Sequence, residues 1–495
     1  MAPLQLRIKN LGNIKDTRIK VSNLTIFVGK NNTNKTWTAY IIHSIASEET
    51  IESYVSDFIW SRRWNLKIKV NFIQNYLSRV KKHIELLVQQ EKVPPFFSKE
   101  DIFFVKNLMR DYLNFVAKEF PSFISISKEQ VKNLKISLCW PSKKKEKELK
   151  ELLELFNKTF NKLARSKWFE NCHEHSIFYE CYLSLIMRSI IRSLFGNPFN
   201  LPVERNTLIT FSNLINLGEG SIYNLSKIRG SLGRTLNFLK ILIQNVKPFE
   251  KSLKQRAVLL QNIEHAIEEL ITIHKLLRPK SFNYNYPVPV KDFKDFVQRL
   301  PFLKPKENYL NEILLSYLQE IIEGEIKIDK TGIVYKTNNE VTLPIMVSSS
   351  MIKSLGGLYA YIAYKAEEND LLIIDEPENN LHPRAQVKMI EFLSFMANKG
   401  IKVLTTTHSP YIVDHLINLI EANNAVEAKE KNPDDLASLF YLKTKDAFIA
   451  KDKVSVYLFS DNGEVKSILD SKTGIIDWGT FGSVSEEISE LYYKI

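Results

Sequence analysis

Hydrophobic and polar residues follow two different patterns along the chain. Residues 4–29 show near alternation of apolar and polar positions around a Gly-Asn turn, which predicts short β-strands. From about residue 50, apolar residues recur three and four positions apart, as in IQNYLSRVKKHIELLVQQ, which predicts helices. Strand-like runs return near residue 323. The predicted fold is therefore α/β, with its core interrupted by a large, mainly helical insertion.

The segment after residue 323 alternates between the two patterns. SLGGLYAYIAYKAEE and PRAQVKMIEFLSFMANKG predict helices, whereas DLLIIDEP and IKVLTTTHSP predict buried strands. We therefore expect an N-terminal core part at 1–49, a basic helical insertion at 50–322, and a C-terminal core part at 323–495 that ends in a β-hairpin. Heptads are too few for a long coiled-coil arm, and a shorter coiled coil inside the insertion stays open.

Composition narrows the class of protein. The chain has 495 residues, of which 44% are hydrophobic and 25% charged, values typical of a large globular protein. The three cysteines, Cys139, Cys172 and Cys181, do not form the dense even set of a disulfide framework. The N-terminus has no apolar signal region, and no stretch of about 18 apolar residues follows. These features predict a cytoplasmic protein without a membrane partner.

The basic charge is concentrated in the middle of the chain. The whole chain carries 68 basic and 56 acidic residues, a net charge of +12. Residues 50–330 hold 45 basic and 30 acidic residues, a net +15, whereas residues 331–495 hold 16 and 23. Such an excess can bind nucleic acid or an acidic protein, and it is equally compatible with a simple solvated surface.

A candidate phosphate-binding loop lies between a predicted strand and a predicted helix. The phrase GKNNTNKT runs from Gly29 to Thr36 with the spacing G-x-x-x-x-N-K-T. In such a loop the backbone N–H groups and the helix N-terminus face a phosphate, Lys35 reaches its oxygens, and the Thr36 hydroxyl meets Mg²⁺. Asn34 replaces the usual second glycine, and asparagine tolerates left-handed backbone angles. The alternative is a polar turn that matches by chance.

Two carboxylates and a histidine follow buried strands far along the chain. LLIIDEPENNLHP places Asp375 and Glu376 at the end of one strand, where burial is costly unless a cation meets them. Asp375 could hold Mg²⁺, and Glu376 could orient or deprotonate a water. The alternative is that they cap the next helix. His408, after LTTT, is expected at the same sheet edge, where α/β sheets bind ligands, although a lone histidine can also be structural.

Four phrases together resemble a known family. GKNNTNKT, SSSMIKSL, IDEPENNLHP and TTTHSP resemble, in order and spacing, the Walker A, signature, Walker B with D-loop, and switch-histidine motifs of ABC-type (SMC/OLD-like) ATPase heads. LPVERN resembles the LPAER-type phrase of the overcoming-lysogenization-defect group. The C-terminal residues contain no DxD phrase of a Toprim nuclease. The chain is thus similar to ATPase subunits of antiphage systems such as PARIS and Septu.

The resemblance implies a set of site residues. Asp375 and Thr36 would hold Mg²⁺, Glu376 would be the catalytic base, and His408 would sense the γ-phosphate. Ser349 and Ser350 would reach ATP held by an opposing subunit, which implies a homo-oligomer built on head dimers. Met351 and Asn34 depart from the family pattern and predict slow turnover. The residues that would bind ATP are Gly29, Asn31, Asn32, Asn34, Lys35 and Thr36, together with Ser349 and Ser350.

The resemblance also implies a biological role. The chain would be an ATP-binding and hydrolysing sensor or scaffold of bacterial antiphage defence that acts with a separately encoded effector nuclease. One alternative is a RecF-like DNA-repair ATPase whose basic insertion clamps duplex DNA. A further alternative, from a different class, is a scaffold that holds ATP with little hydrolysis.

Overall fold

The computed structural model describes residues 5–60, 76, 79–87, 89, 93–141, 146–166, 178–210, 286–329, 332–470 and 473–476. The helices and the coiled coil expected between residues 211 and 285 lie outside these residues.

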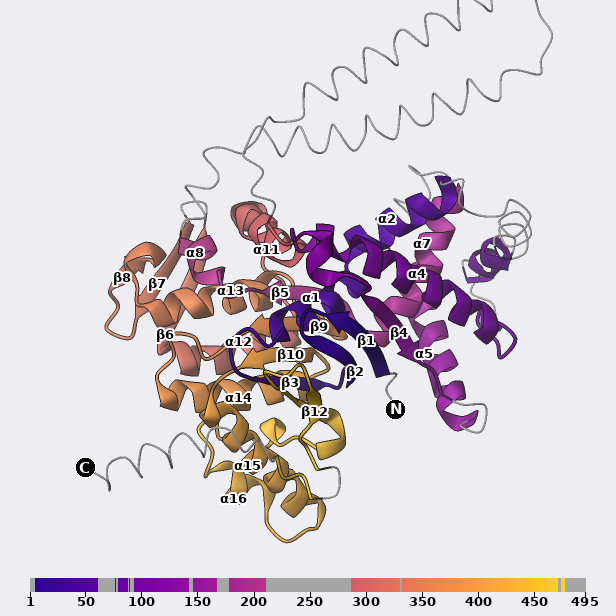
Figure 1. The fold of residues 1–495 in the computed structure, drawn as a ribbon. Helices are drawn as coiled ribbons and strands as arrows, with labels where there is room; N and C mark the ends of the chain where they lie inside the picture. The colour runs from indigo at the N-terminus through magenta and orange to yellow at the C-terminus, as the bar shows by residue number, and fades with distance from the viewer. Residues whose placement is uncertain are drawn as a thin grey trace, which may run out of the picture. The chain divides into compact units, whose positions relative to one another are not determined.

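A six-stranded sheet forms the centre of the fold, with the order β12-β11-β3-β10-β9-β5 (Figure 1). The five strands from β11 to β5 are parallel, and β12 pairs with β11 as the expected hairpin. Strands β3 and β9 are buried over their whole length, which explains their nearly continuous apolar sequences. The strands are β3 (Leu24–Gly29), β5 (Asn197–Leu201), β9 (Asp370–Asp375), β10 (Lys402–Thr407), β11 (Val454–Phe459) and β12 (Val465–Ser467).

Helices predicted from the sequence after the phosphate loop and between the strands β9 and β10 pack on this sheet. Helix α1 directly follows the loop after β3 and contacts β3, β5, β9 and β10, whereas α14 contacts β3 and β10. Pro383 opens α14, as expected for a residue that lacks an N–H group. The helices described are α1 (Lys35–Ala46), α2 (Glu48–Trp60), α4 (Ile102–Phe123), α5 (Glu146–Ala164), α7 (Phe178–Leu194), α8 (Arg205–Thr210), α11 (Val288–Arg299), α12 (Tyr309–Ile322), α13 (Ser350–Tyr364), α14 (Pro383–Asn398), α15 (Pro410–Glu427) and α16 (Pro433–Ala437).

Two smaller antiparallel sheets complete the described part. Their orders are β2-β1-β4 and β6-β7-β8. Strands β4 and β5 lie inside the expected insertion 50–322, yet they pair with β1 and β9. The division into 1–49, 50–322 and 323–495 stays a prediction. The structure adds that two strands from the middle part join the sheets of the other two parts. The strands are β1 (Gln5–Leu11), β2 (Ile14–Lys20), β4 (Lys135–Cys139), β6 (Gly324–Asp329), β7 (Gly332–Thr337) and β8 (Thr342–Pro344).

The register of the parallel strands determines which loops meet. Thr406 of β10 lies opposite Asp375 of β9, and Thr407 lies opposite Val28 of β3. The loops that follow β3, β9 and β10 therefore leave the same edge of the sheet side by side. None of the helices described is both long and apolar enough to cross a membrane.

Candidate functional site

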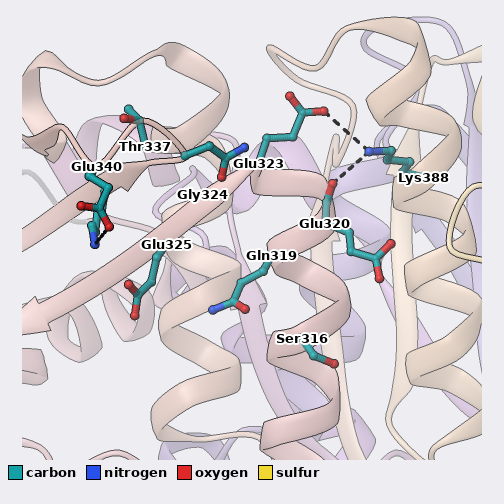
Figure 2. Close-up of a pocket in the computed structure, with 11 residues that line it drawn as sticks. Ser316, Gln319, Glu320, Glu323, Gly324, Glu325, Thr337, Glu340 and Lys388 are labelled. Atoms are coloured by element: carbon teal, nitrogen blue, oxygen red, sulfur yellow. Dashed lines mark hydrogen bonds and ion pairs between the residues drawn. The ribbon is translucent and has the colours of Figure 1, made fainter.

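One polar cavity lies beside α12 and the β6–β7 hairpin (Figure 2). It measures about 810 Å³, and its lining includes four glutamates but only two lysines. The Lys388 amine donates to the carbonyl of Glu320 at 2.9 Å and lies 3.7 Å from the Glu323 carboxylate. None of the predicted site residues lines this cavity, and its excess of carboxylates would repel a phosphate.

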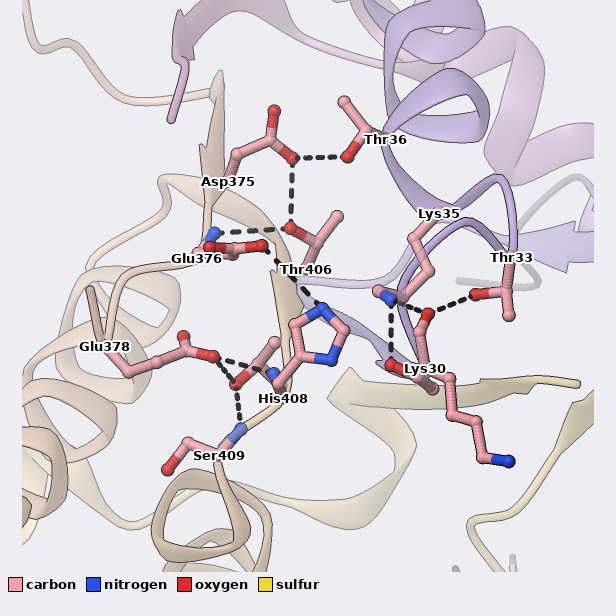
Figure 3. Close-up of polar contacts among 12 residues, drawn as sticks. Lys30, Thr33, Lys35, Thr36, Asp375, Glu376, Glu378, Thr406, His408 and Ser409 are labelled. Carbon is pink, nitrogen blue, oxygen red and sulfur yellow. Dashed lines mark hydrogen bonds and ion pairs between the residues drawn. The ribbon is translucent and has the colours of Figure 1, made fainter. Parts of the chain in front are cut away.

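A second, smaller cavity lies at the carboxyl edge of the central sheet and measures about 520 Å³. Figure 3 shows polar contacts at and beside this cavity, among side chains from the loop after β3 and from the ends of β9 and β10 and the segments that follow them. Seven residues predicted for the nucleotide site line it, five from the loop after β3 and two from segments more than 300 positions later in the sequence. The lining residues are Asn31, Asn32, Thr33, Asn34, Lys35, Thr36, Trp37, Glu376, Thr406 and His408.

The loop before α1 has the backbone of a phosphate cradle. Asn34 has φ 67° and ψ 22°, and Asn32 has φ 62°. The left-handed angle at Asn34 agrees with the tolerance expected of an asparagine there, and Asn32 adds a second left-handed residue that the sequence analysis did not consider. The Asn34 side chain makes no capping hydrogen bond to α1, so it does not satisfy the N–H groups of the first turn. These N–H groups give the start of α1 the character of an anion-binding site.

Lys35 is held at the base of this loop. Its side chain is almost fully buried, and its amine donates to the carbonyls of Gly29 at 2.8 Å and Lys30 at 2.6 Å. An ammonium group has three donors, so one stays available for a ligand. Burial lowers the pKa of Lys35 to about 8, an effect that the carboxylates of Glu376, Glu378 and Asp375 oppose.

Asp375 is a fully buried carboxylate with one oxygen engaged. Its Oδ1 accepts hydrogen bonds from the hydroxyls of Thr406 at 3.0 Å and Thr36 at 3.5 Å, whereas Oδ2 has no partner among the described residues. Burial raises the pKa of Asp375 to about 6, although the Thr406 hydrogen bond and the Arg205 charge oppose this rise. A buried carboxylate oxygen without a partner is costly, and a cation would remove the cost.

Glu376 and His408 face each other across the cavity. The Nε2 atom of His408 lies 3.7 Å from Oε1 of Glu376, and both side chains remain partly exposed. Burial, followed by the charge of Lys35, lowers the pKa of His408, so the imidazole is neutral at pH 7. The Glu378 carboxylate accepts from the backbone N–H of His408 at 2.7 Å and from the Thr407 hydroxyl at 2.8 Å, which fixes the loop that carries the histidine.

Ser349 and Ser350 lie elsewhere. Both are exposed at the start of α13, and neither lines the cavity. The Ser349 hydroxyl accepts a hydrogen bond from the N–H of Ile352 at 3.3 Å and caps the helix. Their predicted contact with a nucleotide held by another subunit stays a prediction.

Sequence reasoning missed four residues around the cavity. Thr406 and Glu378 lie within the phrases TTTHSP and DEPENN, but their side-chain partners depend on strand order. Trp37 follows the phosphate loop directly and lines the cavity. Arg205, which contacts the backbone of Asp375 and Glu376, is part of the LPVERN phrase, and that phrase was the only signal for it.

The residues present fit Mg²⁺ and a triphosphate. Thr36 offers a hydroxyl and Asp375 an unpartnered oxygen, which are the hard oxygen ligands that Mg²⁺ prefers. No group of three or more His, Cys, Asp or Glu side chains in the described part of the chain could hold a metal by itself. A magnesium ion here would therefore take its remaining ligands from phosphate and water.

The comparison with protein families agrees with this site. The sequence model of the family described as an AAA ATPase domain matches residues 4–413. The match covers most of the chain, from before the phosphate loop to beyond His408, and the chain therefore belongs to this family. The chain has an α/β fold with a parallel sheet, and seven of the predicted nucleotide-site residues line the cavity at one edge of that sheet.

Two solved structures are distantly similar to this chain. The Smc head domain with an extended coiled coil bound to the C-terminal domain of ScpA, derived from Pyrococcus furiosus, is 12% identical with a TM-score of 0.31, covering 99% of this chain and 100% of that chain. The Smc head domain with a coiled coil and joint from Pyrococcus yayanosii is 10% identical with a TM-score of 0.30, with the same coverage. Scores of this size support no conclusion about this chain. Among curated proteins there is no match.

Proposed function

We propose that this chain binds ATP with Mg²⁺ in the 520 Å³ cavity, hydrolyses it, and serves as a sensor or scaffold of bacterial antiphage defence that works with a separate effector nuclease. One observation carries the ATPase part: Lys35, Thr36, Glu376 and His408 line one cavity. The buried Asp375 lies directly behind it and accepts a hydrogen bond from the Thr36 hydroxyl at 3.5 Å. This is the combination of phosphate ligand, metal ligand and base that phosphoryl transfer to water needs.

In this proposal the loop from Gly29 to Thr36 binds the triphosphate. The N–H groups of Asn31, Asn32 and Asn34 and the start of α1 would face the phosphate oxygens. The Lys35 amine would use its remaining donor for the β- and γ-phosphates. Bound phosphate would in turn favour the charged form of Lys35, because a nearby anion raises the pKa that burial lowers.

Thr36 and Asp375 would hold the metal ion. A bound Mg²⁺ would supply positive charge that offsets the negative charge developing on the phosphate during transfer. Asp375 would contribute its unpartnered Oδ2, while Thr406 keeps Oδ1 in place at 3.0 Å. The buried carboxylate would then be ionised, since a nearby cation lowers the pKa that burial raises.

Glu376 would orient the attacking water and accept its proton. The water would lie between this carboxylate and the γ-phosphate. His408, neutral at pH 7, would donate one hydrogen bond to the γ-phosphate, with its backbone held by Glu378. The 3.7 Å separation between Glu376 and His408 allows both side chains to address one phosphate group.

Subunit pairing is part of the proposal. Ser349 and Ser350 are exposed at the N-terminus of α13, a position from which they would contact ATP held by a second copy of the chain. ATP binding would thereby favour a head dimer, the unit of a homo-oligomer. The exposed apolar side chains of Met346 and Val347, 46% and 68% exposed, lie just before these serines and would be covered in the dimer.

Support for the antiphage role comes from the motif phrases, including LPVERN, which resemble antiphage ATPase subunits. The net charge of +15 over residues 50–330 favours a second candidate, a RecF-like repair ATPase that binds duplex DNA. The two candidates predict different phenotypes for cells that carry the gene.

Phage plating tests the proposed role. Cells that carry the chain with its neighbouring genes should resist phages, and Lys35→Ala or Glu376→Gln should abolish resistance at equal protein level. A repair ATPase would instead improve survival after DNA damage and leave plaque counts unchanged. Equal plating with and without the genes, over a broad phage panel, would refute the antiphage role.

A further inference from the structure

Arg205 is a buried charge beside the proposed catalytic residues. It opens α8, is 2% exposed, and donates only to backbone carbonyls. Nη1 reaches the carbonyl of Asp375 at 2.6 Å and that of Pro202 at 3.0 Å, and Nη2 reaches the carbonyl of Glu376 at 2.7 Å. A buried guanidinium is costly, and a well-packed apolar residue would often be more stable. The position of this arginine therefore calls for an explanation beyond packing.

The carbonyls that Arg205 contacts lie where the sheet stops. The pairing of β5 with β9 ends at Leu201 and Ile374, so β5 provides no strand partner for the carbonyl of Asp375. On the opposite side, the N–H of Glu376 still donates to the carbonyl of Thr406 at 3.1 Å. Arg205 thus continues the hydrogen bonding of the sheet edge one step beyond β5.

The backbone at Glu376 needs such support. Its φ is 47°, a left-handed angle that is unfavourable for a non-glycine residue and persists only where the surroundings impose it. The N–H group is held from β10, and the carbonyl is held by Arg205. These two contacts determine the direction in which the Glu376 carboxylate leaves the backbone.

The same arginine reaches α13. Its Nε donates to the carbonyl of Ser354 at 3.3 Å. The Ser354 hydroxyl donates to the carbonyl of Asn379 at 3.0 Å and lies 3.2 Å from Nδ2 of Asn380. Two groups of Ser354 therefore connect α13 to the segment that carries Glu376: the carbonyl through Arg205, and the hydroxyl directly. The same helix begins at the exposed Ser350.

We propose that Arg205 is a positioning residue that sets the backbone of Glu376 and, with Ser354, links α13 to the catalytic segment. This inference rests on the proposed function, because it takes Glu376 as the base. A second copy of the chain that engages the start of α13 would then alter the position of Glu376 through this link. Arginine suits the task because its planar fork can address the adjacent carbonyls of Asp375 and Glu376 at once, whereas a lysine has a single point of attachment.

The test compares ATP affinity with the rate of single-turnover hydrolysis in five proteins. These are the parent, Arg205→Lys, Ser354→Ala, Glu376→Gln and the control Arg188→Lys. Arg188 is an equally buried arginine on α7 that pairs with Glu48 and Glu52, away from the cavity. Arg205→Lys should keep its ATP affinity within about threefold, since Arg205 does not line the cavity. Its hydrolysis should fall about 10²-fold, the usual effect of a misplacement of about 1 Å.

Ser354→Ala should likewise keep its ATP affinity and hydrolyse ATP more slowly, with a smaller loss of rate than Arg205→Lys. Arg188→Lys should hydrolyse ATP at the parent rate. The proposal is overturned if Arg205→Lys hydrolyses ATP like the parent, or if its affinity and rate fall together. Should Arg205→Lys fail to fold, Ser354→Ala decides by the same comparison of ATP affinity with hydrolysis rate, because it removes only a hydroxyl. Equal hydrolysis by the parent and Glu376→Gln would refute the proposed function itself, an outcome visible without the Arg205 variant.

Discussion

Replacing Gly12 by alanine tests whether the turn between β1 and β2 supports the phosphate loop. Gly12 has φ 54°, and a Cβ atom there would lie 2.6 Å from Oδ1 and 2.8 Å from Nδ2 of Asn34. Asn34 is the residue that takes the place of the second loop glycine and directly precedes α1. A methyl group at Gly12 should therefore push on the loop from outside the cavity.

The expected cost has two parts. Alanine at a left-handed φ costs about 1 kcal/mol in free energy of unfolding. The overlap with the Asn34 amide adds at least about 1 kcal/mol, the low end for overpacking, because the amide is the tip of a short side chain. Asn34→Gly removes the overlapping atoms, so that Gly12→Ala in this background should cost only the first part. The two changes should then be coupled by about 1 kcal/mol.

Chemical denaturation of the parent, both single variants and the double variant measures this coupling. Gly400→Ala is the matched control, since Gly400 has φ 92° but a Cβ there would meet only the Glu368 side chain, at 3.8 Å. It should cost the conformational part alone, with no coupling to Asn34→Gly and no change in ATP affinity. Gly12→Ala should lower ATP affinity, and the double variant should recover it. Additivity within about 0.5 kcal/mol, or equal losses for Gly12→Ala and Gly400→Ala, would refute the reasoning.

Two further predictions concern stability and subunit pairing. Burial lowers the pKa of His43 to about 3, against 6.5 in the unfolded chain, so its contribution to stability is present above pH 6.5 and is lost as the pH falls. Between pH 7 and 5 the parent should lose about 2 kcal/mol relative to His43→Phe in denaturation experiments, and a constant difference would contradict this. Mixing Lys35→Ala with Ser349→Arg subunits should restore ATP hydrolysis that neither shows alone, since a mixed dimer has one intact composite site. Mixtures that form dimers but do not hydrolyse ATP would count against an ATP site shared between two subunits.

The parts of the site written as continuous phrases were predictable from the sequence. GKNNTNKT and IDEPENN each follow a buried apolar run, and such runs predict strands whose carboxyl ends meet at one edge. The meeting of Lys35 and Thr36 with Asp375 and Glu376 is confirmed as geometry, while their roles stay proposals. The left-handed angle at Asn34 is also confirmed.

The remaining contacts depend on strand order, which no local pattern contains. The Thr406 hydroxyl donates to the Asp375 carboxylate because β10 lies next to β9. Arg205, which follows β5, donates to the backbone carbonyls of Asp375 and Glu376 because β5 lies on the other side of β9. The strands β4 and β5 have only five residues each and lie between helical segments, so their pairing with β1 and β9 carries no clear periodic signal. The contact of Gly12 with Asn34 likewise arises from packing of one loop on another.

The most direct test of the account measures ATP binding and single-turnover hydrolysis in the parent, Lys35→Ala, Glu376→Gln and Lys445→Ala. Lys445 is the control, since its amine is exposed, pairs with Asp434 at 3.1 Å and does not line the cavity. Lys35→Ala should lose roughly ten- to a hundredfold in ATP affinity, the value of a charged hydrogen bond. Glu376→Gln should keep its affinity and hydrolyse ATP about 10²- to 10⁴-fold more slowly, as expected for loss of a general base. Lys445→Ala should match the parent in both measurements. Parent-like hydrolysis by Glu376→Gln, or unchanged ATP affinity in Lys35→Ala, would contradict the central claim that this cavity binds and hydrolyses ATP.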